Sequence, residues 1–381
     1  MNVPSIKKIG FVCWADPFSD KKAWSGTFFN LRSAIENAGF EVVWIPVRPN
    51  TVVLNYWKRF LYKFAHNAIF EHTFIYVYLC ARSINRKLID SVDCLFFPGG
   101  AQMLYFLRGI RRKPTIYLAD ATFHQMIDYY WHDLPKWIIR SGERLEKVAI
   151  RKSSVRIYSS DWARESACCH YKAVADSTYV LEFGANLSTS NIKSCKPYKI
   201  GEELRIMFSG VEWERKGADI AIDTARLLNE SGIPTKLLLT GIQPGKVPEG
   251  YCGLDFVEYV GFLNKNEPSE ESVYAGYLAW AHCFLLPSKA ECSATVLSEA
   301  ASFGLPAFTY DTGGLSNYVI NGNNGYRLPI ESGPSAFSSK IAQCIVHDKL
   351  GELRKGALAI SESKLNWSTW SKSFVRIISK L

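Results

Sequence analysis

The stretch FLLPSKAECSATVLSEAASFGLP, residues 284–306, constrains the fold more than any other part of the chain. Its apolar start, Phe284–Leu286, is followed at once by a proline and is typical of a buried strand in a parallel sheet. A polar turn comes next, and Ser293 is the expected N-cap of a helix that ends at Gly304 and Pro306. A strand, a turn and a helix in this order predict one repeat of a parallel α/β sheet.

The turn in this stretch carries two features that suit an anionic ligand. The unpaired N–H groups of the first helical turn, at Ala294, Thr295 and Val296, and the helix dipole point to the same spot. Glu291 lies at the rim of that spot, and Glu299 follows on a helix face that can line the same crevice. The alternative from these residues alone is that both carboxylates are ordinary solvent-exposed charges.

The same alternation of strands and helices runs along the whole chain. Residues 9–14, 28–35 and 41–46 read as strand, helix and strand, which is the crossover unit of a parallel sheet. Because 381 residues exceed one ordinary core, we expect two domains. Polar residues 186–203 are the expected linker between them.

Composition excludes several classes of protein. A net charge of +9 favours acidic ligands, but the basic residues form no long block, so nucleic acid is not an expected partner. The ten cysteines include no CxxC pair, which favours a reducing, cytoplasmic compartment over a disulfide framework or a zinc site. No uninterrupted apolar stretch is long enough to span a bilayer. The apolar run after Lys8 is too short for a signal peptide and is expected to be the first strand.

Residues 56–81 mix aromatic and basic side chains. Trp57, Phe60 and Tyr62 alternate with Lys58, Arg59 and Lys63. Such a segment can lie on a membrane surface, and the alternative is a pair of ordinary helices packed on the core.

Candidate ligand-binding residues follow other strands. Asp120 and His124 come after the run that ends at Ala119, at the strand end where open parallel sheets bind ligands. Gly26 precedes the first helix, where the missing side chain lets a ligand approach the backbone. Arg215 and Lys216 follow the first strand of the second half and can meet two phosphates.

The order of these motifs resembles the family-4 retaining glycosyltransferases of the GT-B fold. The residues that carry the resemblance are Ser209-Gly210, Arg215-Lys216-Gly217, Pro287-Ser288, Glu291, Glu299, Gly304-Leu305-Pro306, Gly313-Gly314, Asn321-Gly322 and Gly325-Tyr326. The resemblance implies an α/β fold of two facing Rossmann-like domains with parallel sheets. The implied division is an acceptor domain over 1–185, the linker over 186–203, a nucleotide-sugar domain over 204–364 and a helix over 365–381 that packs back on the first domain.

The resemblance also implies roles for residues. Arg215 and Lys216 would stabilise the departing diphosphate, Glu291 would hold the donor sugar and Glu299 the ribose hydroxyls. The other implied donor-binding residues are Gly26, Ser209, Gly210 and the backbone amides of Thr295, Val296 and Leu297. Asp120 stands where many members have a histidine and is the expected sugar contact, with His124 as an acceptor or sugar contact. Cys292-Ser293 replaces a glycine-rich pair of the family, which puts the packing of the sugar in doubt.

The expected function is transfer of a hexose from a nucleotide-diphosphate sugar to a glycan or lipid-linked glycan in bacterial surface polysaccharide assembly. The reaction is expected to retain the anomeric configuration and to need no metal and no cofactor, since no Asp-x-Asp cluster stands out at a strand end. The basic and aromatic segment suggests a cytoplasmic protein peripheral to the inner face of the membrane. The alternative is a sugar or nucleotide-sugar sensor of the same fold that binds without catalysis.

Overall fold

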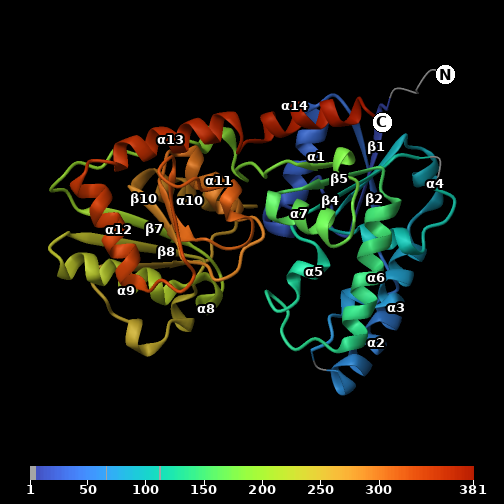
Figure 1. The fold of residues 1–381 in the computed structure, drawn as a ribbon, viewed down its shortest axis with the longest axis horizontal. Helices are drawn as coiled ribbons and strands as arrows, with labels where there is room; N and C mark the ends of the chain where they lie inside the picture. Colours follow the sequence, from blue (N-terminus) through green and yellow to red (C-terminus); the bar gives the residue numbers. More distant parts are fainter. Residues whose placement is uncertain (1–5, 66, 111–112) are drawn as a thin grey trace. The chain divides into compact units, whose positions relative to one another are not determined.

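The computed structural model describes residues 6–65, 67–110 and 113–381. The chain divides into two compact units, residues 1–181 with 370–381, and residues 182–369. Each unit contains one six-stranded parallel sheet with helices packed against it (Figure 1). The predicted α/β class, with two parallel sheets and a C-terminal helix, is therefore confirmed.

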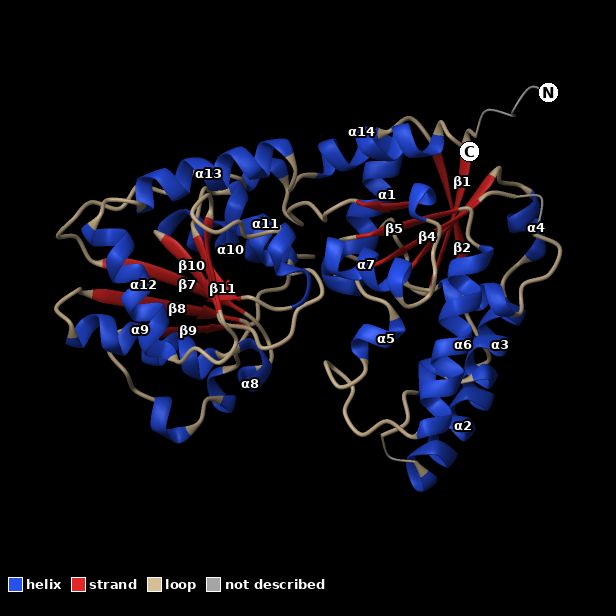
Figure 2. Ribbon diagram, viewed as in Figure 1, coloured by secondary structure: helices blue, strands red, loops and turns tan. Residues whose placement is uncertain are grey.

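The sheet of the first unit has the strand order β2-β1-β3-β4-β5-β6. Its strands are β1 (Lys8–Cys13), β2 (Glu41–Pro46), β3 (Cys94–Pro98), β4 (Thr115–Ala119), β5 (Val155–Tyr158) and β6 (Thr178–Val180). Its helices are α1 (Thr27–Asn37), α2 (Thr51–Phe64), α3 (Phe74–Ser83), α4 (Arg86–Asp90), α5 (Phe123–Met126), α6 (Lys136–Lys152) and α7 (Asp161–Cys169). The central strands β3 and β4 are buried along their whole length, as expected for a parallel sheet covered on both faces (Figure 2).

The sheet of the second unit has the order β12-β11-β10-β7-β8-β9. Its strands are β7 (Leu204–Ser209), β8 (Thr235–Thr240), β9 (Val257–Gly261), β10 (Cys283–Leu286), β11 (Ala307–Tyr310) and β12 (Gly325–Leu328). Its helices are α8 (Trp213–Lys216), α9 (Ala218–Glu230), α10 (Pro268–Trp280), α11 (Thr295–Ser302), α12 (Pro334–Val346) and α13 (Leu350–Ser363). Helices α9 and α12 pack side by side, and so do α11 and α13.

The segment expected to be a linker, residues 186–203, lies within the second unit. Leu187 and Cys195 are buried in the core of that unit, and the Cys195 N–H donates to the carbonyl of Phe303 at 2.8 Å. The apolar residues in this polar stretch thus anchor it to the second unit.

The last helix, α14 (Trp367–Ile378), belongs to the first unit from Trp370 onward. The Ser371 hydroxyl donates to the carbonyl of Ala34 at 2.7 Å, and the Phe374 ring packs edge-on against Phe96. These contacts join the end of the chain to the sheet that its beginning forms.

Candidate functional site

The loop between β10 and α11 forms the centre of the candidate site. All residues of β10 are buried, and Ser288, two residues after the end of the strand, is fully buried as well. Helix α11 begins at Thr295 with Ala294 as its N-cap, and no side chain caps it. The prediction of Ser293 as N-cap is therefore wrong: the chain stays extended at Ala294, so the helix begins one residue later than a Ser293 cap would place it.

Glu291 is buried in this loop and paired with two cations. Its side chain is 6% exposed, and its Oε1 atom forms an ion pair with Lys216 Nζ. Arg215 Nη1 lies 3.7 Å from the same oxygen. The Glu291 carbonyl accepts a hydrogen bond from the Gly314 N–H at 3.1 Å, so the backbone is fixed as well. A solvent-exposed loop carboxylate, the alternative from the sequence, is excluded.

Arg215, on the short helix α8 after β7, connects this helix to the loop after β10. Its guanidinium donates from Nη1 to the Ala290 carbonyl at 3.0 Å and from Nε to Glu212 Oε2 at 2.9 Å. The Lys289 N–H donates to the Arg215 carbonyl at 2.8 Å. Hydrogen bonding from Arg215 holds the pKa of Glu212 below its usual value. Glu212 is an exposed residue that the motif analysis did not select.

Glycines allow these two loops to approach each other. Gly217 has φ +70°, and a Cβ atom there would lie 2.3 Å from the Pro287 carbonyl oxygen. A Cβ on Gly210 would lie 2.8 Å from Cγ of Lys216. Both positions therefore require glycine for close packing beside Glu291.

Glu299 is fully buried in α11 and also has a cationic partner. Lys265 Nζ lies 2.5 Å from Glu299 Oε1, and the Tyr274 hydroxyl donates to Oε2 at 3.0 Å. The Tyr274 oxygen also lies 3.3 Å from the Ser209 hydroxyl, which connects the end of β7 to this carboxylate. Burial, and then the Glu299 charge, raise the pKa of Tyr274 well above its usual value. Lys265 and Tyr274 were missed because no spacing motif joins them to Glu299.

One of the backbone amides predicted at the N-terminus of α11 is hydrogen-bonded within the helix. The Leu297 N–H donates to the Ala294 carbonyl at 2.9 Å, and its contact with phosphate or sugar stays a prediction. Thr295 and Val296 occupy the first turn, where N–H groups point out of the helix. These two amides and the positive end of the helix dipole are features of this loop that suit an anion.

Gly26 and Asp120 lie in the first unit, where the Trp24 side chain connects Asp120 to the turn that contains Gly26. The Trp24 indole N–H donates to Asp120 Oδ2 at 3.2 Å, and Trp24 lies two residues before Gly26. Trp24, Ser25 and Gly26 all have positive φ, at 50°, 56° and 86°. A left-handed backbone costs about 1–2 kcal/mol per non-glycine residue, so this turn before α1 is strained.

His124 is engaged elsewhere in the first unit. Its Nδ1 atom lies 3.1 Å from Glu143 Oε1. The structure thus forms one group from Ser209, Gly210, Arg215, Lys216, Glu291 and Glu299 in the second unit. It forms a second group around Trp24 and Asp120 in the first unit.

Residues 203–347 match the family model described as glycosyl transferases group 1. The second unit therefore contains a glycosyl transferases group 1 domain, as the motif order predicted. Membership of family 4 stays a prediction.

A curated relative from Salmonella typhimurium (strain LT2), named "Putative colanic acid biosynthesis glycosyltransferase WcaL", is 30% identical over 150 residues. The match covers 36% of this chain, and the chain spans about a third of the length of this relative, 35%.

Solved structures of glycosyltransferases share the fold over almost the whole chain. The lipopolysaccharide outer core galactosyltransferase WaaB matches with a TM-score of 0.67 at 14% identity, covering 98% of this chain and 100% of that one. WaaG, involved in lipopolysaccharide biosynthesis, matches with a TM-score of 0.61 at 16% identity, covering 97% and 99%. Anabaena Alr3699/HepE in complex with UDP and glucose matches with a TM-score of 0.62 at 17% identity, covering 98% and 100%. The fold is therefore that of the GT-B glycosyltransferases.

Proposed function

We propose that this protein is a retaining, metal-independent glycosyltransferase that moves a hexose from a nucleotide-diphosphate sugar to a glycan acceptor. One observation carries the proposal: Arg215 and Lys216 converge on the buried Glu291 beside the N-terminus of α11. The names of the relatives, which concern colanic acid and lipopolysaccharide biosynthesis, support bacterial surface polysaccharide assembly as the process.

The two cations serve the departing diphosphate. Breaking a glycosyl-phosphate bond places negative charge on the leaving group, and fixed cations stabilise that charge best when they need no rearrangement. Glu291 holds Lys216 and Arg215 in place before any ligand arrives. A diphosphate beside Thr295 and Val296 shares these cations with Glu291, and the helix amides supply further donors.

Glu299 suits the ribose hydroxyls of the nucleotide. A carboxylate has about four acceptor positions, and Lys265 and Tyr274 use two of them. Because the Glu299 side chain is fully buried, ribose reaches it only after side chains that cover it move. Asp120 and Gly26 of the first unit are the proposed further contacts of the sugar and the diphosphate.

Donor turnover tests the proposal. The protein is incubated with UDP-glucose, GDP-mannose or ADP-glucose and a bacterial lipid-linked glycan extract, and release of the nucleoside diphosphate is measured. We expect acceptor-dependent release from one donor, and a decrease of at least 100-fold in Lys216→Ala, because a lost charge-stabilising donor costs about 10²–10³ in rate. Binding of a nucleotide sugar without turnover with any acceptor would instead support a sensor.

Helix α2 fits the surface of an anionic membrane, and we include this contact in the proposal. Val52, Tyr56, Phe60 and Tyr62 on α2 are each more than half exposed. The helix carries Lys58, Arg59 and Lys63 and no acidic residue, which complements anionic lipid headgroups. Within the described ranges, no helix combines the length and the apolar character needed to cross a bilayer.

Sedimentation with vesicles tests this contact. The protein is expected to sediment with phosphatidylglycerol-rich vesicles and not with phosphatidylcholine vesicles. A triple Lys58→Glu, Arg59→Glu and Lys63→Glu variant should lose most of this binding, whereas a triple Glu variant of Lys340, Lys355 and Lys372 serves as the charge-matched control. Unchanged sedimentation of the α2 variant would remove the membrane contact from the proposal.

A further inference from the structure

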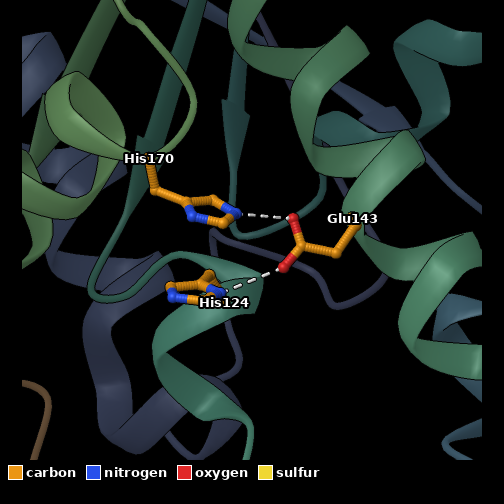
Figure 3. Close-up of side chains that lie close together, drawn as sticks. All are labelled: His124, Glu143 and His170. Carbon is orange, nitrogen blue, oxygen red and sulfur yellow. Dashed lines mark hydrogen bonds and ion pairs between the residues drawn. The ribbon is translucent and has the colours of Figure 1, made fainter. Parts of the chain in front are cut away.

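His124, Glu143 and His170 form a cluster of metal-ligating side chains in the first unit. One ligand atom from each lies within 4.8 Å of the others. His124 Nδ1 lies 3.1 Å from Glu143 Oε1, and His170 Nε2 lies 3.0 Å from Glu143 Oε2 (Figure 3). The two imidazole rings stack at 3.7 Å between centroids, with 11° between their planes. Both rings therefore present a nitrogen to the same carboxylate.

The three side chains come from separate helices that the core holds together. His124 lies on α5, Glu143 on α6, and His170 is the C-cap of α7. Gly142 lets the Phe123 ring pack against the α6 backbone, since a Cβ there would lie 2.1 Å from the ring. This contact places the neighbours of Gly142 and Phe123, which are Glu143 and His124, side by side.

A second set of contacts fixes α5 against α7. The Thr122 and Ser166 hydroxyls lie 2.7 Å apart, and Gln125 Nε2 donates to the Trp162 carbonyl at 2.7 Å. The buried Tyr171 hydroxyl accepts the His124 N–H at 3.1 Å. The ligand set is thus positioned by the core rather than by flexible loops.

We propose that His124, Glu143 and His170 bind a divalent transition-metal ion of the zinc class. Two imidazoles and one carboxylate form a ligand set that favours zinc, whereas calcium and magnesium favour sets made of oxygen ligands alone. Ligand atoms of a tetrahedral zinc site lie about 3.3 Å apart, given bonds of about 2.0–2.1 Å. Each histidine nitrogen here lies 3.0–3.1 Å from one of the two Glu143 oxygens, and one ligand atom from each of the three residues lies within 4.8 Å of the others, so small side-chain movements bring the set to that spacing.

The exposure of the cluster defines the kind of site. The side chains of His124, Glu143 and His170 are 47%, 25% and 39% exposed, so an ion can enter from solvent and keep a water as fourth ligand. The ion clamps α5, α6 and α7 to one another. The inference concerns these side chains alone and does not depend on the proposed function.

Cobalt and zinc binding test the proposal. The metal-free full-length protein is titrated with CoCl2, and visible d–d absorption is recorded; ZnCl2 binding is measured by calorimetry. We expect one site per chain, with tetrahedral cobalt bands, and at least tenfold weaker zinc binding in His170→Ala and in Glu143→Gln. Zinc should also raise the melting temperature of the wild type and not that of His170→Ala.

Matched variants separate this site from other zinc ligands. His347→Ala removes an exposed histidine of the second unit, and Cys169→Ser removes the exposed thiol next to His170. Both are expected to bind zinc as the wild type does. Melting temperatures in EDTA establish that all variants fold. Absent cobalt bands, or zinc binding that Cys169→Ser abolishes and His170→Ala keeps, would overturn the proposal.

Discussion

A buried carboxylate in the second unit depends on one cationic side chain. Glu299 has no exposed surface, and Lys265 is the cation that faces it. A carboxylate in such a place is stable only with its partners, since the cost of removing it from water is several kcal/mol. The sequence indicated Glu299 by its spacing from Glu291 but gave no sign of Lys265, because that lysine reaches the carboxylate from a loop 34 residues away.

Removal of Lys265 should therefore destabilise the second unit. We expect Lys265→Met to lower the free energy of unfolding by about 3 kcal/mol, because Glu299 is left buried with Tyr274 as its neutral donor. The double variant Lys265→Met with Glu299→Gln should recover part of that loss, since no unpaired buried charge remains. Urea unfolding followed by fluorescence measures both values. Additive losses in the double variant would contradict the coupling.

In the second unit, Gly217, which lies between α8 and α9, packs against the loop after β10. Gly217→Ala places a Cβ against the Pro287 carbonyl and also forces a left-handed backbone on alanine. Gly232 is a matched control, because it has φ +83° and a Cβ there meets nothing within 4 Å.

The two variants together separate the cost of the clash with the Pro287 carbonyl from the cost of a left-handed alanine. Gly232→Ala should lower the free energy of unfolding by about 1 kcal/mol, the cost of a left-handed alanine, and Gly217→Ala by at least about 2 kcal/mol. Thermal unfolding of both variants measures the difference. Equal losses would show that the loop after β10 moves away from α8 without cost.

Helix α6 of the first unit carries a carboxyl group that makes stability depend on pH. Burial raises the pKa of Glu146 from 4.5 to about 8, against the opposing hydrogen bond from Tyr117. The folded state therefore keeps this proton between pH 4.5 and about pH 8, whereas the unfolded state releases it. The contribution of Glu146 to stability is complete below pH 4.5 and is lost as the pH rises toward 8.

Glu146→Gln should remove this dependence. In the wild type, ionisation of Glu146 lowers the free energy of unfolding by up to about 1.4 kcal/mol per pH unit as the pH rises. The variant should therefore have a higher melting temperature than the wild type at pH 8, and the difference should be much smaller at pH 5. Thermal unfolding at both pH values, in EDTA, measures the gain. The same difference between variant and wild type at both pH values would contradict the shifted pKa.

The boundaries of elements followed the local sequence where a clear signal existed. Strand β2 has the bounds that the sequence predicted, Glu41–Pro46. Helix α11 begins later than Ser293 predicted, because the chain is extended at Ala294 and no side chain caps the helix. The extended backbone at Ala294 leaves no local pattern in a single sequence.

At the scale of the whole molecule, the chain folds into two units with separate cores, and the last helix belongs mostly to the first unit. The order of motifs over residues 205–328 predicted the group 1 glycosyltransferase domain that the family model matches. The cluster of His124, Glu143 and His170 was not predicted, because its members are spread over 47 positions and meet only through the packing of three helices.

A nucleotide thermal-shift screen tests the central claim, a nucleotide-diphosphate site in the second unit, most directly. UDP, GDP and ADP are added to the wild type, Arg215→Ala, Glu299→Gln and Arg226→Ala. Arg226 is the matched control, because it forms an i,i+3 pair with Asp223 as Arg215 does with Glu212. One nucleotide should raise the melting temperature of the wild type and of Arg226→Ala, with a shift at least halved in the other two variants. No shift with any nucleotide, or a shift that Arg215→Ala and Glu299→Gln leave intact, would contradict the site.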